Sequence, residues 1–136
     1  MKKVVFVCVH NSGRSQMAEA FAKKLSAGKV FAESAGTQPA DELNPTVVRV
    51  MEEIGYDMTG HYPKMLTLDM MNSADRIITM GCGVDAEGVC PASIVQTEDW
   101  GLEDPKGQPI EKVRQIRDQI KARVEKLIEE ITMGEA

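Results

Sequence analysis

Apolar residues follow two different periods along the chain, and each period predicts one type of element. The short run from Val4 to Val7 is rich in β-branched residues and is followed by polar residues, which is typical of a buried parallel strand that ends in a loop. From Ser15 to Gly28, apolar residues recur every three or four positions, and this spacing predicts an amphipathic helix. The first 28 residues are therefore predicted to form a strand, a loop and a helix.

The same two periods predict the remaining elements. Three further short apolar runs are typical of strands: residues 30–34, residues 77–79, and a weaker run at Ile94 and Val95. Three segments have helical spacing: residues 44–55, which Asn44 and Pro45 are expected to cap, the short segment 66–71, and a long amphipathic segment over residues 110–131. Strands and helices thus alternate from one end of the chain to the other.

This alternation predicts an α/β fold with a doubly wound, four-stranded parallel sheet flanked by helices, of the Rossmann-like kind. A chain of 136 residues buries one core of ordinary size, so we expect a single domain over residues 1–136. Ligands of such sheets bind at the carboxyl ends of the strands, and Cys8 is expected at one of these ends.

The net charge and the lengths of the apolar runs indicate which kinds of partner the chain can bind. A formal charge of -5 and a pI near 5.1 leave no broad basic surface for nucleic acid. No apolar run approaches the roughly 20 residues that span a bilayer, and the apolar start from Lys2 to Val9 is too short for a signal peptide. We therefore expect a cytoplasmic monomer that binds neither nucleic acid nor membrane. Three cysteines, an odd number, favour catalytic or redox use over a disulfide framework.

The predicted loop between the first strand and helix contains a cysteine and an arginine separated by five residues, Cys8 and Arg14. Backbone N–H groups of such a loop, together with the start of the following helix, can surround a tetrahedral oxyanion, while the arginine binds two of its oxygens. The residues expected to bind the oxyanion are Val9, His10, Asn11, Ser12, Gly13, Arg14 and Ser15. The same groups favour the thiolate of Cys8, which makes it a nucleophile at neutral pH.

Individual residues of this loop have expected roles. Ser15 can donate a hydrogen bond to the Cys8 sulfur, Asn11 can adopt the left-handed backbone conformation that the loop needs, and Gly13 can supply a further positive φ. The alternative is that Cys8 ends a buried strand as a small hydrophobic residue. Arg14 and Ser15 at the right offsets, between a strand and a helix, favour the catalytic interpretation.

The segment from Cys8 to Ser15, followed by Gln16, Met17, Ala18 and Glu19, resembles the active-site loop of the low-molecular-weight protein tyrosine phosphatase superfamily. Within that superfamily, the segment from Ser15 to Glu19 and the later pair Cys82 and Cys90 resemble the thioredoxin-coupled arsenate reductases. The resemblance covers nearly the whole chain, including residues 34–36 and 100–105. It implies the low-molecular-weight phosphatase fold and a reaction without a metal or organic cofactor.

The resemblance also implies roles for residues outside the loop. Asp104, which precedes Pro105, matches the general acid that protonates the departing oxygen. Cys82 is expected to attack Cys8 and release arsenite, and Cys90 to attack Cys82 and present the resulting disulfide to thioredoxin or a similar dithiol reductant. The alternatives are that Asp104 belongs to a solvated acidic turn, and that the two cysteines are inert or bind zinc with His10 or His61.

In the reductases that this chain resembles, a potassium ion lies behind the loop that corresponds to residues 8–14 here, which we call the anion loop. Its side-chain ligands match Asn11, Glu19 and Ser34 here, together with an aspartate shortly after a histidine that matches His61. At the aspartate's position this chain has Lys64, and we expect its ammonium group to reach Glu19 and replace the ion. The alternative is a solvated lysine without a role. Asn11, Ser15, Glu19, Ser34, His61 and Lys64 are thus expected to support the loop.

Three functions remain at this point. The first is an arsenate reductase, which uses Cys8 as the nucleophile and Cys82 and Cys90 as a disulfide relay. The second is a phosphatase whose phosphocysteine is hydrolysed by water. The third is a non-enzymatic redox sensor or anion-binding module. Residues 106–108 lack the aromatic side chains that flank phosphotyrosine in eukaryotic phosphatases, which favours a small inorganic oxyanion such as arsenate or phosphate.

Overall fold

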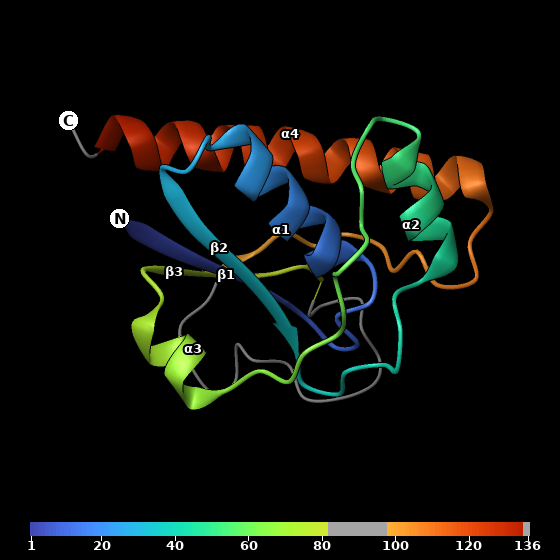
Figure 1. Ribbon diagram of the computed structural model, residues 1–136, viewed down its shortest axis with the longest axis horizontal. Coiled ribbons are helices and arrows are strands. Elements are labelled where there is room, and N and C mark those ends of the chain that lie inside the picture. Colours follow the sequence, from blue (N-terminus) through green and yellow to red (C-terminus); the bar gives the residue numbers. More distant parts are fainter. Residues whose placement is uncertain (82–97, 135–136) are drawn as a thin grey trace.

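The computed structural model describes residues 1–81 and 98–134, which form a twisted parallel sheet with helices on both faces (Figure 1). The strands are β1 (Lys2–Cys8), β2 (Val30–Gly36), β3 (Arg76–Thr79) and β4 (Glu98–Asp99). Their spatial order is β2-β1-β3-β4, and every neighbouring pair is parallel. The two central strands, β1 and β3, therefore end at the same edge of the sheet.

The helices are α1 (Arg14–Leu25), α2 (Pro45–Glu52), α3 (Leu68–Ser73) and α4 (Ile110–Gly134). As predicted, the Asn44 side chain caps α2 by accepting from the Thr46 backbone N–H, and Pro45 begins the helix. In Figure 1, α1, α2 and the long α4 lie on one side of the sheet and α3 lies on the other.

Each face of the sheet has its own apolar core. On the larger side, Val4 and Phe6 of β1 pack with residues of α1, α2 and α4, among them Phe21, Met51 and Ile120, all fully buried. On the smaller side, alternate residues of the same strand pack toward α3, as the period of two in a β-strand requires. Because β1 is buried on both faces, its sequence is a continuous apolar run rather than an alternating one.

The predicted α/β class, the parallel sheet and the positions of the main helices are confirmed. The third helix begins at Leu68, two residues later than predicted, because Thr67 acts as its N-cap and accepts from the Met70 backbone N–H. The fourth strand was predicted at Ile94 and Val95, which lie outside the described residues; the fourth strand of the structure is Glu98–Asp99. Within the described ranges, no helix is long and apolar enough to cross a membrane.

Candidate active site

Cys8 is the last residue of β1, at the carboxyl edge of the sheet, and its side chain is buried. Its sulfur accepts a hydrogen bond from the Asn11 backbone N–H at 3.2 Å and lies 2.8 Å from the Ser15 hydroxyl oxygen. The side-chain amide of Asn11 donates to that same oxygen at 2.7 Å, which leaves the Ser15 hydrogen free to donate to the sulfur. Both donors stabilise a negative charge on Cys8.

The backbone of the loop is held from outside by the segment that follows β2. Three of its carbonyl groups accept backbone N–H groups of this segment: Val9 O from Gln38 at 2.8 Å, His10 O from Ala40 at 2.9 Å, and Ser12 O from Asn44 at 2.9 Å. These peptides are trans, so the N–H on the other side of each peptide points toward the inside of the loop. The Asn11 N–H, directed at Cys8, is one of these, and the arrangement is a concave set of donors suited to an oxyanion.

Two conformational predictions for the loop have opposite outcomes. Asn11 has a φ of 50°, so the predicted left-handed conformation is confirmed. The predicted positive φ of Gly13 is wrong, because its φ is -141°. Glycine is favoured at this position by a close contact instead: a Cβ atom on Gly13 would lie 3.0 Å from Cγ of Pro105. Pro105 thus packs directly on the anion loop.

Arg14 begins α1, and its side chain is 4% exposed. Its Nη1 atom donates to the backbone carbonyl of Leu102 at 2.9 Å and approaches that of Met80 at 3.5 Å. Its Nη2 atom lies 4.0 Å from a carboxylate oxygen of Asp104. The guanidinium group therefore joins the anion loop to the chain after β3 and to the segment that carries the predicted general acid.

Asp104 lies next to the loop rather than in a detached acidic turn. Its side chain is 43% exposed, and its Oδ1 atom accepts the Lys106 backbone N–H at 3.0 Å. The neighbouring Glu103 points elsewhere and pairs with Lys112 at 2.9 Å. Of these two carboxylates, Asp104 is the one that the structure brings to Arg14, which is the position expected of the predicted general acid.

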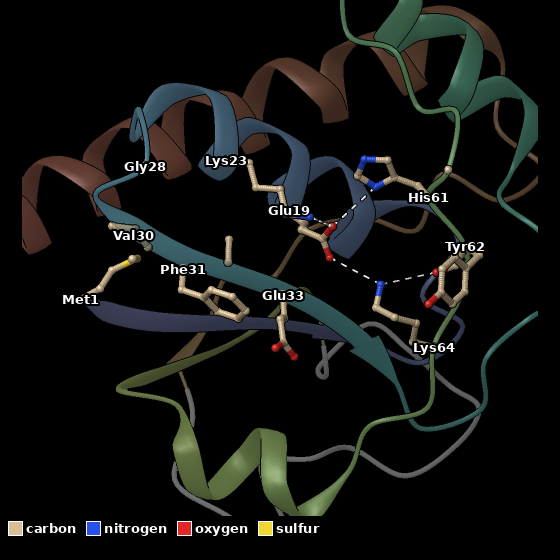
Figure 2. A pocket seen from close by; sticks show the side chains of 12 residues that line it. Met1, Glu19, Lys23, Gly28, Val30, Phe31, Glu33, His61, Tyr62 and Lys64 are labelled. Atoms are coloured by element: carbon tan, nitrogen blue, oxygen red, sulfur yellow. Dashed lines mark hydrogen bonds and ion pairs between the residues drawn. The ribbon is translucent and has the colours of Figure 1, made fainter.

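Behind the loop, the buried carboxylate of Glu19 is surrounded by polar groups from three segments of the chain, and Figure 2 shows Lys23, His61 and Lys64 among them. One oxygen accepts the Ser34 hydroxyl at 2.7 Å and lies 3.5 Å from Lys64 Nζ. The other accepts Lys23 Nζ at 2.9 Å and lies 3.6 Å from Nδ1 of His61. Glu19, Lys23, His61 and Lys64 line a pocket of about 490 Å³ beside β2. The expectation that the Lys64 ammonium reaches Glu19 is confirmed.

These contacts and the burial of the side chains shift the pKa values of Glu19 and His61. Burial acts to raise the pKa of Glu19, but hydrogen bonds from Lys23 and Ser34 and the charge of Lys64 bring it below its ordinary value. Burial lowers the pKa of His61 despite the nearby Glu19 carboxylate, so His61 is neutral at pH 7. Two ammonium groups and a neutral imidazole therefore face one carboxylate.

The residues at the place of the implied potassium ion do not fit such an ion. Both oxygens of Glu19 already accept donors, and two of these donors are cations. The side-chain oxygen of Asn11 accepts the Lys64 backbone N–H at 2.8 Å and the Gln16 side-chain amide at 3.0 Å. A further cation here would be repelled by Lys23 and Lys64 and would find its oxygen ligands engaged.

Cys82 and Cys90 lie outside the described residues. His10, another member of the predicted oxyanion loop, directs Nδ1 at the Gln38 carbonyl, 3.0 Å away. Two residues of the site were not among those predicted. Lys23 is four positions after Glu19, and this spacing is the signal that could have indicated the pair. Gln16 is fully buried beneath the loop, and besides the nearby Asn11 its partners Tyr62 and His61 are more than 40 residues away, so spacing along the chain gave no comparable signal.

Comparison with known proteins places these features in a family. The chain is 44% identical over 135 residues to a protein named glutaredoxin arsenate reductase from a Synechocystis species, covering 97% of this chain and all of that one. A solved arsenate reductase in its phosphate-binding state has a TM-score of 0.79 and 44% identity, covering 96% of this chain and 99% of that chain. A thioredoxin-dependent arsenate reductase of Corynebacterium glutamicum also has a TM-score of 0.79, with 35% identity. The match to the Corynebacterium protein covers 98% of this chain and 63% of that longer chain.

The model of the family described as low molecular weight phosphotyrosine protein phosphatase matches residues 3–135, nearly the whole chain. The match includes the loop with Cys8 and Arg14 and the segment with Asp104, which the structure brings together. This chain therefore belongs to the low molecular weight phosphotyrosine protein phosphatase family.

Proposed function

We propose that this protein is an arsenate reductase that uses Cys8 as its nucleophile. The observation that carries the proposal is the environment of the Cys8 sulfur, which receives the Asn11 N–H and the Ser15 hydroxyl inside a loop of inward N–H groups. This arrangement serves any tetrahedral oxyanion. The names of the relatives that cover nearly the whole chain favour arsenate over a phosphate ester.

In the first step, the Cys8 thiolate attacks arsenic in bound arsenate. The loop N–H groups and Arg14 stabilise the negative charge on the arsenate oxygens. Asp104 gives its proton to the departing oxygen, which leaves as water, and a sulfur–arsenic bond takes its place. Arsenic is still pentavalent after this step, because no electron pair has yet been transferred to it.

In the second step, the Cys82 thiolate attacks the Cys8 sulfur. A disulfide forms, the sulfur–arsenic bond breaks, and its electron pair remains on arsenic, which leaves as trivalent arsenite. The Cys90 thiolate then attacks Cys82 and releases the Cys8 thiolate. An external dithiol of the thioredoxin or glutaredoxin class finally reduces the disulfide between Cys82 and Cys90. A relay of this kind uses all three cysteines of the chain.

The test compares arsenite production with hydrolysis of an aryl phosphate in the parent and in the Cys82→Ser and Cys90→Ser variants. Thioredoxin with its reductase, and glutaredoxin with glutathione, are supplied in separate reactions. We expect arsenite from the parent with at least one of these reductants, and from neither variant under multiple turnover. Mass spectrometry of Cys90→Ser after arsenate treatment should detect a bridge between Cys8 and Cys82. Rapid ester hydrolysis without arsenite production would instead establish a phosphatase.

A further inference from the structure

The peptide that joins Asn11 to Ser12 is held differently from its neighbours in the anion loop. The carbonyl groups of Val9, His10 and Ser12 accept backbone N–H groups of the segment after β2. The carbonyl group of Asn11 accepts the side-chain amide of Gln16 at 3.1 Å instead. This peptide therefore depends on the identity of one side chain, whereas its neighbours depend on the main chain.

The geometry around Gln16 defines which way its amide points. Its Nε2 atom lies within 3.1 Å of three oxygens: the Asn11 carbonyl, the Asn11 side-chain oxygen and the Tyr62 carbonyl. Its Oε1 atom lies 3.2 Å from Nδ1 of His61. A reversed amide would set Oε1 against three acceptors, so the NH₂ group faces the loop and Nδ1 of His61 is the donor to Oε1.

The direction of the Asn11 carbonyl fixes the direction of the Ser12 N–H, because both groups belong to the same planar peptide. In a trans peptide the two groups point in opposite directions, and the peptide between Asn11 and Ser12 is trans. Its carbonyl points back to Gln16, beneath the loop, so the Ser12 N–H points toward the concave side where the other loop donors converge. The parallel case is the preceding peptide, whose carbonyl is held by Ala40 and whose N–H reaches the Cys8 sulfur.

We propose that Gln16 is a positioning residue that holds the Ser12 N–H as a donor to the bound oxyanion. Without the Gln16 amide, this peptide loses its outer hydrogen bond and can rotate so that the Asn11 carbonyl faces the anion. That rotation would replace a donor with an acceptor where negative charge binds. The assignment of arsenate as substrate rests on the proposed function, but the positioning role concerns any tetrahedral oxyanion in this loop.

The test is the Gln16→Met variant, in which a side chain of similar length lacks the amide. Phosphate affinity of the reduced protein is measured by calorimetry, and Cys8 reactivity is measured by alkylation with iodoacetamide at pH 7. Loss of one preorganised donor should weaken phosphate binding by about tenfold or more. Alkylation should change much less, because the Asn11 N–H and the Ser15 hydroxyl still reach the sulfur. Gln115→Met, on an exposed position of α4, is the matched control and should bind phosphate as the parent does.

A measurement on the parent keeps the proposal testable if Gln16→Met does not fold. In ¹⁵N-labelled protein titrated with phosphate, the Ser12 amide proton should move downfield as it begins to donate to the anion. Unchanged phosphate affinity in a folded Gln16→Met variant, an alkylation rate that falls as much as the affinity, or an unaffected Ser12 amide would each overturn the positioning role. A parent that binds neither phosphate nor arsenate would overturn the proposed function as well.

Discussion

The hydroxyl oxygen of Ser15, the second residue of α1, lies 2.8 Å from the sulfur of Cys8 at the other end of the loop. The Asn11 side chain donates to this oxygen, so the remaining hydrogen of Ser15 is directed at the sulfur. The nucleophile is thus held by a donor on the first turn of α1 as well as by a donor of the loop.

Replacing Ser15 by alanine should slow alkylation of Cys8 at pH 7 and lower kcat/KM for arsenate by about ten- to a hundredfold, because a hydrogen bond to a charged group is lost. Ser26→Ala is the control, since Ser26 ends the same helix and its buried hydroxyl has no hydrogen-bond partner among the described residues. Equal alkylation rates in the parent and Ser15→Ala would contradict the role of this hydroxyl.

Removing the carboxyl group of Asp104 should slow the chemical step. Asp104→Asn keeps the shape of the side chain but has no proton to give the leaving oxygen, so kcat should fall by about a hundredfold or more. Glu103→Gln is the matched control, because Glu103 pairs with Lys112 away from the loop. Pre-steady-state measurement of the first arsenate turnover separates this step from reduction of the disulfide. Similar losses in both variants would count against Asp104.

Gly36 should be intolerant of any side chain. A Cβ atom there would lie 2.5 Å from the Val9 carbonyl oxygen and 3.0 Å from the Asn11 nitrogen, both in the anion loop. Gly36→Ala should therefore lower the free energy of unfolding by about 1–3 kcal/mol and also impair oxyanion binding. Thermal unfolding and phosphate titration measure the two effects. Gly134→Ala, where a Cβ would meet no atom within 4 Å, should leave both unchanged.

The loop and the elements on either side of it were predictable because the signals are local. The β-branched run before Cys8, the helical spacing after Ser15 and the tolerance of asparagine for a left-handed conformation are all contained within a few consecutive residues. The order of strands and helices followed from the same kind of signal. Local periodicity therefore sufficed for the fold and for the position of the nucleophile.

What could not be predicted depends on contacts between distant segments. Gln16 meets the Tyr62 carbonyl 46 residues away, and Gly13 is packed against Pro105, more than 90 residues away. The residues around Gln16 or Gly13 in the sequence do not indicate that Tyr62 or Pro105 will lie next to them in the fold. The prediction for Gly13 was wrong because its φ is negative, and the close approach of Pro105, which leaves little space for a side chain there, could not be predicted from the loop sequence.

The depressed pKa of Glu19 makes a contribution to stability that depends on pH. Burial acts to raise this pKa, but Lys23, Ser34 and Lys64 lower it below the 4.5 of an unperturbed glutamate. The folded state then binds the proton less readily than the unfolded state, so the contribution is present above about pH 4.5 and is lost as the pH falls through the folded pKa. Urea unfolding between pH 3 and 7 should show a smaller loss of stability in Glu19→Gln than in the parent. Identical pH dependence in the two proteins would contradict this.

Lys64 lies 3.5 Å from Glu19, where the related reductases are expected to hold a potassium ion, and this gives the last prediction. A tethered ammonium group supplies positive charge at any salt concentration, whereas a bound ion stabilises the fold only in proportion to its occupancy. The melting temperature and arsenate turnover of the parent should therefore be the same in sodium and potassium chloride at matched ionic strength. Lys64→Asp removes one cation and adds an oxygen ligand, so this variant should melt at a lower temperature in sodium chloride and recover in potassium chloride. Lys29→Asp makes the same change of charge at an exposed position and should acquire no preference between the ions. A parent that melts several degrees higher in potassium than in sodium would show that the ion, and not Lys64, supplies the charge behind the loop.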